Sequence, residues 1–345
     1  MSLSGTLGID ITFARQAAAS VRFAQPRAVP VSALLKGCTP DEAISRVGSL
    51  FALCGNAHAT AAVSAAEAAT HAEPAPQVRR ARLMLVAAEA LREHFFRIAV
   101  DWPALIGEPP QTAALKPVTE MFSRLRALLG PTIFKSGSTA AVDDETSKQF
   151  ASALAATVSQ AVFGEDGPAL SSRASIAAWA KKGETIAARL LASLNAAKAA
   201  DDLFQPEQTV FGRWRDDARL SGSEAFRRVL ARILEIDALC HSLGNLAGLE
   251  RACQLTTQVF GDRGHGASAG IDVARGRLHH ELEIRDGLIA AYSISAPTGR
   301  NFDAGGAAEQ AIARIRSADL AAFEQQAKLL VLEIDPCVAY ELRVH

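Results

Sequence analysis

The chain has 345 residues, of which 49% are apolar and 21% charged, and its formal net charge is −1. Such a chain can bury a large core and is expected to be globular. Because the charge is nearly balanced and no long run of Lys or Arg occurs, we expect neither nucleic acid nor an anionic membrane as a partner.

The N-terminal segment predicts a β-hairpin. Apolar residues alternate at Ile9 and Ile11 and again at Val21 and Phe23, with the turn expected within residues 16–20. The same segment lacks a basic start followed by an unbroken apolar stretch, which argues against a signal peptide or a membrane span. We therefore expect a cytoplasmic protein.

Long Ala-rich stretches then predict helices. Residues 41–70 and 79–99 contain no proline and indicate two long antiparallel helices, separated by the proline-containing segment 73–76. Stretches rich in Gly, Pro, Ser and Asp separate the further helices that we expect at 117–129, 145–163, 174–200 and 223–260.

A second hairpin is predicted near the C-terminus. Residues 276–284 and 288–294 alternate on either side of Asp286-Gly287, a strong hairpin signal. Helices are expected at 307–317 and 320–331, followed by an irregular tail. The sequence thus predicts an α+β, mostly α fold in a single domain, 1–345, with an N-terminal hairpin (1–30), a helical body (31–260) and a C-terminal part (261–345).

Two cysteines lie in motifs at opposite ends of the chain. Cys54 and His58 are four residues apart, so on one helix they would share a face and His58 could orient the Cys54 thiolate. A single Cys and His on an Ala-rich helix more often belong to the core. Near the C-terminus, Cys337 stands in the sequence Asp-Pro-Cys.

These motifs resemble those of nickel-iron hydrogenase large subunits. Those proteins carry Cys-x-x-Cys-x-x-x-His near the N-terminus and Asp-Pro-Cys-x-x-Cys-x-x-His at the C-terminus. Here Phe51 and Tyr340 stand where each motif has another thiolate, whereas Cys54, His58 and Cys337 keep their places. The resemblance therefore implies a metal site that has lost half of its thiolates.

A third match precedes and follows the late hairpin. Arg275-Gly276 and Pro297-Thr298 resemble the large-subunit segments whose arginine and hydroxyl residue hold the two cyanide ligands of the iron. Taken alone, such dipeptides would be routine turn chemistry. With the matches in this order along the chain, it is identified as a member of the HupK/HoxV-type hydrogenase maturation proteins, which resemble truncated large subunits.

The resemblance implies a non-catalytic scaffold that transiently holds an Fe(CN)2CO unit during hydrogenase assembly. Its metal ligands would be Cys54 and Cys337, surrounded by His58, Arg275, Pro297 and Thr298. No nickel is expected, because nickel outcompetes iron for soft donors unless donors are removed. The implied partners are HypC/HypD-type assembly proteins and the hydrogenase large-subunit precursor.

Two other functions stay open at this point. The chain could be a metal-free docking protein for assembly factors, or an unusual hydrogenase-like enzyme that uses iron alone. The second would need an electron path, and the sequence has no cysteine cluster for iron-sulfur centres.

The remaining cysteines and the tail give further expectations. Five scattered cysteines predict reduced thiols rather than a disulfide framework. Cys38 is either a third thiolate or, more simply, a packing residue, and Cys240 and Cys253 are expected on one helix in the core.

Asp335 is expected to cap the local backbone or, alternatively, to bind Arg275. Catalytic large subunits are made with a C-terminal extension that is cleaved after nickel arrives, whereas this sequence stops two residues after Arg343. The resemblance therefore implies that there is no extension to cleave and that the tail is mobile.

Overall fold

The computed structural model describes residues 5–25, 31–51, 53–165, 167, 170–194, 207–245, 248–260 and 265–345. Strands β1 (Leu7–Ala14) and β2 (Ala17–Ala24) form the expected N-terminal hairpin. Its turn is shorter than predicted, because Arg15 and Gln16 both adopt positive φ angles, of 52° and 67°, and connect the strands directly. Pairing therefore resumes at Ala17, inside the segment predicted as the turn.

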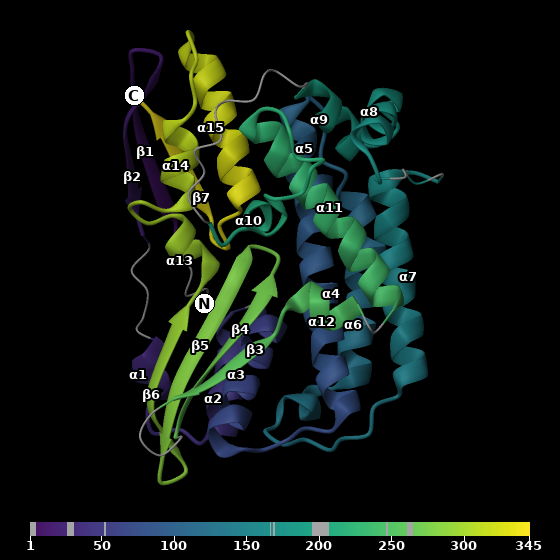
Figure 1. Ribbon diagram of the computed structural model, residues 1–345, viewed down its shortest axis with the longest axis vertical. Coiled ribbons are helices and arrows are strands. Elements are labelled where there is room, and N and C mark those ends of the chain that lie inside the picture. Colours follow the sequence, from purple (N-terminus) through teal and green to yellow (C-terminus); the bar gives the residue numbers. More distant parts are fainter. Residues whose placement is uncertain are drawn as a thin grey trace.

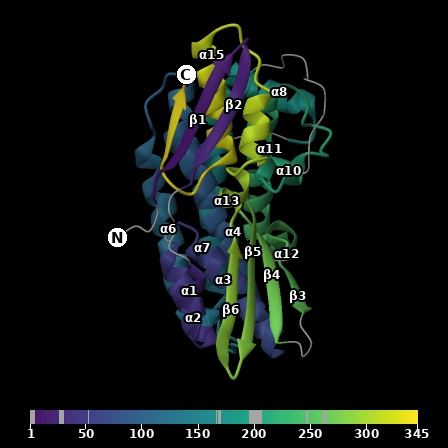
Figure 2. The same cartoon turned by 90° about the vertical axis from the view of Figure 1, so that its left-hand side faces the viewer.

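The C-terminal tail is also a strand, β7 (Tyr340–Val344), contrary to the predicted irregular segment. It pairs in parallel with β1, from Leu7 opposite Tyr340 to Ile11 opposite Val344, and gives a three-stranded sheet in the order β2-β1-β7 (Figure 2). The alternation of Leu342 and Val344 is short, and its partner strand lies at the other end of the sequence. The tail could therefore not be recognised as a strand from local pattern alone.

The helix predicted over residues 41–70 is broken in two. After the short α1 (Val31–Leu35), α2 (Pro40–Leu50) begins at a Thr39 capping box with Glu42, and α3 (Gly55–Thr70) follows after a tight corner. Gly48 and Gly55 bring the two helices so close that a Cβ on Gly55 would overlap the Gly48 carbonyl. This close approach fixes the corner that contains Cys54.

A layer of long helices forms most of the remaining body (Figure 1). The central one, α4 (Pro76–Phe96), continues into a π-helical turn, Arg97–Asp101. The other helices of this body, long and short, are α5 (Trp102–Leu105), α6 (Leu115–Leu129), α7 (Asp144–Phe163), α8 (Arg173–Lys182), α9 (Ile186–Ser193), α10 (Val210–Trp214), α11 (Glu224–Gly244) and α12 (Leu249–Cys253), with 3-10 turns at Thr112–Ala114 and Pro131–Phe134.

Two of the predicted helices differ from the observed ones. The stretch 174–200 is divided into α8 and α9 by a turn at Gly183, and its last residues lie outside the described part of the chain. The stretch 223–260 contains α11, α12 and then strand β3 (Thr256–Phe260). Thr256, Thr257 and Val259 are β-branched, which favours the strand once the neighbouring β4 offers a partner.

The second sheet is antiparallel in the order β3-β4-β5-β6. It adds β4 (Gly266–Val273), β5 (Gly276–Arg285) and β6 (Leu288–Ser295), and the predicted Asp286-Gly287 turn joins the last two. The Ala-rich α3 packs between this sheet and α4, and small side chains allow that close contact. The chain then forms α13 (Pro297–Asn301), α14 (Ala307–Ala313) and α15 (Leu320–Ile334) before β7.

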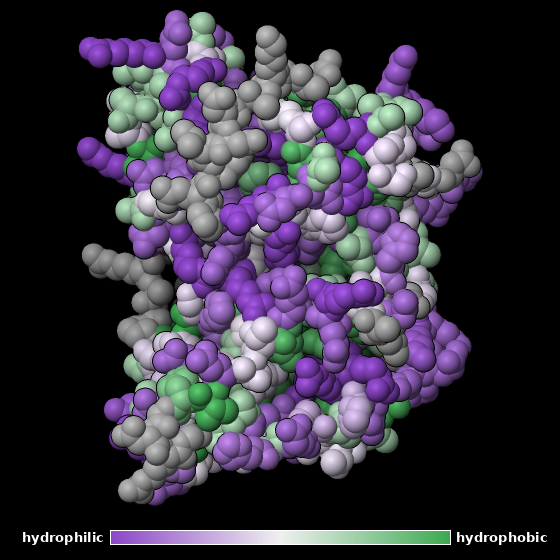
Figure 3. All heavy atoms as spheres, viewed as in Figure 1, coloured by the Kyte–Doolittle hydropathy of each residue, from purple (hydrophilic) through white to green (hydrophobic). Residues whose placement is uncertain are grey.

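Both sheets lie on one side of the molecule, with the long helices on the other (Figures 1 and 2). Three groups of buried apolar residues hold the layers together: one among the long helices, one between α3 and the four-stranded sheet, and one between the three-stranded sheet and α15. Polar residues cover most of the face seen in Figure 3. No helix in the described part of the chain is long and apolar enough to cross a membrane.

Candidate metal-binding site

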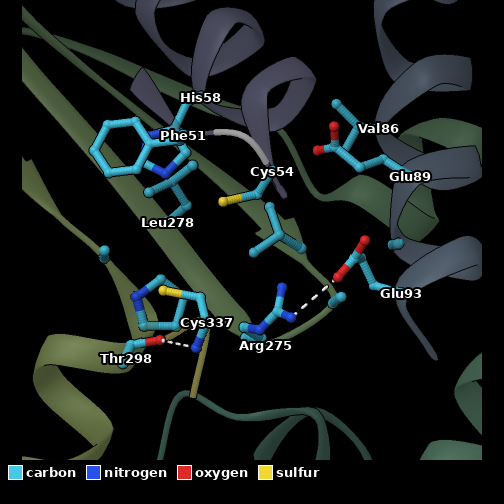
Figure 4. A pocket seen from close by; sticks show the side chains of 15 residues that line it. Phe51, Cys54, His58, Val86, Glu89, Glu93, Arg275, Leu278, Thr298 and Cys337 are labelled. Carbon is cyan, nitrogen blue, oxygen red and sulfur yellow. Dashed lines mark hydrogen bonds and ion pairs between the residues drawn. The ribbon is translucent and has the colours of Figure 1, made fainter. Parts of the chain in front are cut away.

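A small pocket lies where α3, α4, the β4–β5 turn and the segment after α15 meet (Figure 4). Its volume is about 40 Å³, which is more than one water molecule needs, and its walls are largely apolar. The structure brings all six residues singled out in the sequence to this pocket: Cys54, His58, Arg275, Pro297, Thr298 and Cys337.

The first thiol is held at the start of a buried helix. Cys54 occupies the N-cap position of α3, where its side chain makes no capping hydrogen bond. It is therefore free to point into the pocket, as Figure 4 shows. Burial raises the pKa of the Cys54 thiol above its ordinary value, the Glu89 carboxylate raises it further, and Arg275 acts in the opposite direction. An empty pocket thus favours the neutral thiol.

The second thiol is held by the beginning of α13. Pro297 starts that helix, and the Thr298 hydroxyl oxygen accepts a hydrogen bond from the Cys337 backbone N–H at 3.0 Å. This bond fixes the backbone beside the thiol and leaves the hydroxyl hydrogen available to donate to another acceptor. Thr298 and Cys337 thus form one side of the pocket, opposite Cys54 (Figure 4).

Arg275 supplies a buried positive charge that interacts with both thiols. Its Nη2 lies 3.1 Å from Glu93 Oε2, its Nε lies 3.3 Å from Asp335 Oδ1, and Asn301 Nδ2 donates to its backbone oxygen. Gly276 follows it at a φ of 128°, in a place where a Cβ would overlap the Gln208 carbonyl. The turn therefore depends on glycine, and it sets Arg275 at the pocket wall.

Asp335 is the anion around which three arginines gather. Its carboxylate lies 2.7 Å from Arg97, 3.4 Å from Arg232 and 3.3 Å from Arg275, at a residue with a φ of 64°. Although burial raises its pKa, the three guanidinium groups outweigh burial and hold the pKa of Asp335 well below its usual range. Both roles considered for Asp335 are observed: it is the C-cap residue of α15, where its backbone N–H donates to the Val331 carbonyl, and its carboxylate contacts Arg275.

His58 faces the pocket but does not bond to Cys54 in the way we predicted. Its ring stacks on Phe51 with centroids 3.6 Å apart, and its Nδ1 lies 3.0 Å from His280 Nε2, while His280 Nδ1 lies 2.7 Å from the Tyr292 hydroxyl. Burial lowers the pKa of His58 and lowers that of His280 to about 3, so both rings are neutral. The prediction assumed one helix, whereas Cys54 sits at the corner before α3.

Two carboxylates on α4 complete the surroundings, and sequence reasoning missed both. Glu93 binds Arg275, and Glu89 accepts hydrogen bonds from the first turn of α3; burial raises the pKa of Glu89 to about 7. They are four residues apart on a helix whose neighbouring residues are mostly apolar. Two acids at helical spacing on such a buried surface are a signal that could have been recognised.

The pocket supplies few metal ligands of its own. Within the described ranges, no group of three or more His, Cys, Asp and Glu side chains is placed to hold a metal ion. Two thiols and a buried cation therefore suit a metal that arrives with other ligands already bound, better than a bare ion that needs four or more donors from protein.

Comparison with known proteins gives the family. No family model matches the chain. Hydrogenase expression/formation protein HupK of Bradyrhizobium diazoefficiens is 31% identical to it, over 99% of this chain and 98% of that protein. The chain belongs to the HupK family. The corresponding HupK of Rhizobium leguminosarum bv. viciae is 28% identical over 99% of this chain and 97% of that protein. The family predicted from the sequence motifs is confirmed.

The HoxV protein of Cupriavidus necator is a more distant relative, 26% identical over 89% of this HupK-family chain and 88% of its own. Among solved structures, the Ni-Fe-Se hydrogenase of Desulfovibrio vulgaris Hildenborough in its as-isolated oxidized state covers 94% of each chain with a TM-score of 0.62 at 14% identity. An NAD+-reducing [NiFe]-hydrogenase covers 93% of each with a TM-score of 0.55 at 16% identity. The predicted large-subunit-like, mostly helical α+β fold is confirmed.

Phe51 and Tyr340, which by the motif resemblance stand where hydrogenase large subunits have thiolates, lie in different places. Phe51 lines the pocket and stacks on His58, so an aromatic ring fills the space beside the first thiol. Tyr340 does not line the pocket; it begins β7, opposite Leu7. In this HupK-family protein, residue 340 is thus part of the three-stranded sheet.

The other cysteines lie outside the pocket. Cys38 is buried between α1 and α2, where its thiol faces the Leu34 carbonyl at 3.6 Å, which is the packing role that we favoured. Cys240 and Cys253 are on α11 and α12 rather than on one helix, and both face backbone oxygens in the helical core. All five cysteines are free thiols, as predicted.

Proposed function

We propose that this protein acts in hydrogenase formation as a non-catalytic carrier, which holds an Fe(CN)2CO unit and passes it to the hydrogenase large-subunit precursor. The observation that carries the proposal is the pocket itself: Cys54 and Cys337 both line it, together with Arg275 and Thr298 (Figure 4). The names of the relatives, hydrogenase expression/formation proteins, support a role in the same process.

Two thiolates are enough for an iron that brings its own ligands. Fe(II) with two cyanides, one carbon monoxide and two thiolates carries a net charge of about −2, and burying such a charge without compensation would be costly. Arg275 is itself buried, and it donates hydrogen bonds to the described residues through Nε and Nη2 only. Its Nη1 can therefore donate to a cyanide nitrogen. The Thr298 hydroxyl, whose oxygen already accepts from Cys337, can donate to the other.

The same pocket disfavours nickel. Phe51 and Tyr340 each stand where the large-subunit motifs have a thiolate. Tyr340 lies in β7, and its side chain does not line the pocket. A nickel ion would find two thiolates instead of four. Since soft donors normally favour nickel over iron, removing donors is a direct way to keep the site for iron.

Release also follows from the chemistry of the pocket. Burial and Glu89 favour the neutral Cys54 thiol, so the cargo must displace a proton to bind and can be displaced when the proton returns. A carrier needs this reversibility, whereas a resident catalytic centre does not. The donors and acceptors we propose are HypC/HypD-type assembly proteins and the large-subunit precursor.

An anaerobic infrared spectrum tests the proposal. The protein is purified from cells that contain the cofactor assembly machinery, and the cyanide and carbonyl stretching region, nearly empty in proteins, is recorded. We expect two cyanide bands and one carbonyl band, lost in Cys54→Ala and in Cys337→Ala and retained in the control Cys240→Ala, whose thiol lies in the helical core.

Two outcomes would replace the proposal with one of its alternatives. A blank spectrum from freshly purified, folded protein, together with undisturbed hydrogenase maturation by Cys337→Ala, would make the chain a metal-free docking protein. Hydrogen-dependent dye reduction by the purified protein would make it an enzyme.

A further inference from the structure

The carboxylate of Glu89 is bonded to the backbone that follows the first thiol. Its Oε2 accepts from Asn56 N at 3.0 Å and from Asn56 Nδ2 at 2.6 Å, and its Oε1 accepts from Ala57 N at 3.0 Å. These N–H groups belong to the first turn of α3, which Cys54 leaves without a side-chain cap. Glu89, on α4, thus supplies the cap that the N-cap residue does not.

The Glu89 carboxyl group has no close cation, and because burial raises its pKa to about 7 against the opposing effect of Arg92, it carries its negative charge mainly above pH 7. Within the described part of the chain, no Arg, Lys or His nitrogen lies within 4 Å of its carboxylate, although the side chain is only 4% exposed. Glu93, one helical turn later, differs because it pairs with Arg92 and Arg275. A buried carboxylate without a paired cation is costly, and capping a helix does not by itself require a charge.

We propose that Glu89 sets how tightly the pocket holds its iron cargo. Its hydrogen bonds keep Cys54 directed into the pocket, and its charge repels the anionic iron unit, so that the cargo is held but can leave. This inference rests on the proposed carrier function. Arg275, which lines the same pocket, attracts this cargo, and within a buried site both charges act strongly because little water screens them.

The opposite charges of Arg275 and Glu89 explain why both residues line one pocket. With Arg275 alone, the dithiolate iron unit would gain a neutralising contact and nothing would favour its release. With Glu89 ionised, entry of the anionic cargo is opposed from the α4 side of the pocket. Glu89 is therefore a positioning and release residue rather than a ligand.

The test compares Glu89→Gln, which keeps the shape and one acceptor oxygen but removes the charge, with Glu89→Ala, which removes both. Glu120→Gln, at an exposed site on α6, is the matched control for net charge. The first measurement is the rate at which the cyanide and carbonyl bands disappear from loaded protein after dilution into buffer that contains a competing thiol.

At pH 8, about one unit above the pKa of Glu89, we expect Glu89→Gln to lose the bands up to about tenfold more slowly than the wild type and the control. Glu89→Ala should show a lower initial occupancy, because the first turn of α3 and with it Cys54 lose their anchor. Band loss from Glu89→Gln as fast as from the control would overturn the release role, and full occupancy in Glu89→Ala would overturn the positioning role.

The second measurement needs no iron. The rates at which iodoacetamide alkylates Cys54 and Cys337 in the empty protein are compared in the same sample by peptide mass spectrometry. Removing the charge of Glu89 should increase the ratio of Cys54 to Cys337 alkylation, and an unchanged ratio would refute the inference even if iron is carried. If no variant ever shows the infrared bands, the carrier proposal fails while this ratio still decides whether Glu89 acts on Cys54.

Discussion

Removing the anion at the centre of the three arginines should destabilise the whole fold. In Asp335→Asn the side chain keeps its shape, but the carboxylate that contacts Arg97, Arg232 and Arg275 is lost. Each arginine keeps one other carboxylate, respectively Asp101, Glu333 and Glu93. The cost is therefore at the low end of the range for breaking a buried ion pair, about 3 kcal/mol.

The expected shift in the melting temperature follows from the size of the chain. An unfolding entropy of about 2.1 cal/mol/K per residue gives roughly 0.7 kcal/mol/K for 345 residues, so a loss of about 3 kcal/mol corresponds to a fall of about 4 °C. Circular dichroism during heating measures it at a fixed scan rate.

Asp101→Asn is the matched control. Its carboxylate also bonds Arg97, but the pair is partly exposed, at 16% and 24%, so its loss should cost below about 1 kcal/mol. If Asp335→Asn melts at the same temperature as Asp101→Asn, the reasoning that the buried anion holds the three arginines together is wrong.

Three further predictions concern the residues around the pocket. Burial lowers the pKa of His280 to about 3 from its ordinary 6.5, so its contribution to stability is present above about pH 6.5 and is lost as the pH falls toward 3. His280→Gln should therefore flatten the dependence of the urea-unfolding free energy on pH between pH 6.5 and pH 3. An unchanged slope would contradict this prediction. Thr298→Val leaves the Cys337 N–H without its acceptor and should lower the unfolding free energy by about 1–3 kcal/mol and shift a cyanide band, whereas Thr298→Ser should do neither. Tyr340→Phe should leave iron retention at the wild-type level in the infrared assay, because this side chain does not line the pocket; weaker retention would mean that the tail contributes to it.

Local signals in the sequence were enough for several elements. The Asp286-Gly287 turn sits between two alternating runs, and each run needs only its neighbour to form a strand. The helices near 117–129 and 145–163 also match α6 and α7 within two residues. In these segments the local residue pattern is enough to predict the element, although α7 also packs against α4 and α11.

Other elements depend on partners far away in the sequence. The corner between α2 and α3 exists because Gly48 and Gly55 meet, and nothing in the Ala-rich pattern of residues 41–70 indicates that contact. Strand β7 needs β1, at the opposite end of the chain. Short segments of this kind have no period that separates a strand from an irregular tail.

The candidate site shows the same division. The motif resemblance pointed to Cys54, Cys337, Arg275 and Thr298, and the structure brings them to one pocket. The resemblance did not include the electrostatic surroundings, in which Asp335 holds three arginines and Glu89 holds the start of α3. Those roles depend on which helix faces which, and only the tertiary arrangement supplies that information.

The pairing of β1 with β7 has a consequence for the order in which the protein is made. Leu7 is synthesised 333 residues before its partner Tyr340 (340 − 7), and Cys54 long before Cys337. Contacts of such long sequence separation form late in folding, because a large loop must close first. Under the proposed carrier function, a nascent chain that has only Cys54 cannot offer two thiolates, so the cargo binds after Cys337 has been made and β7 has paired with β1.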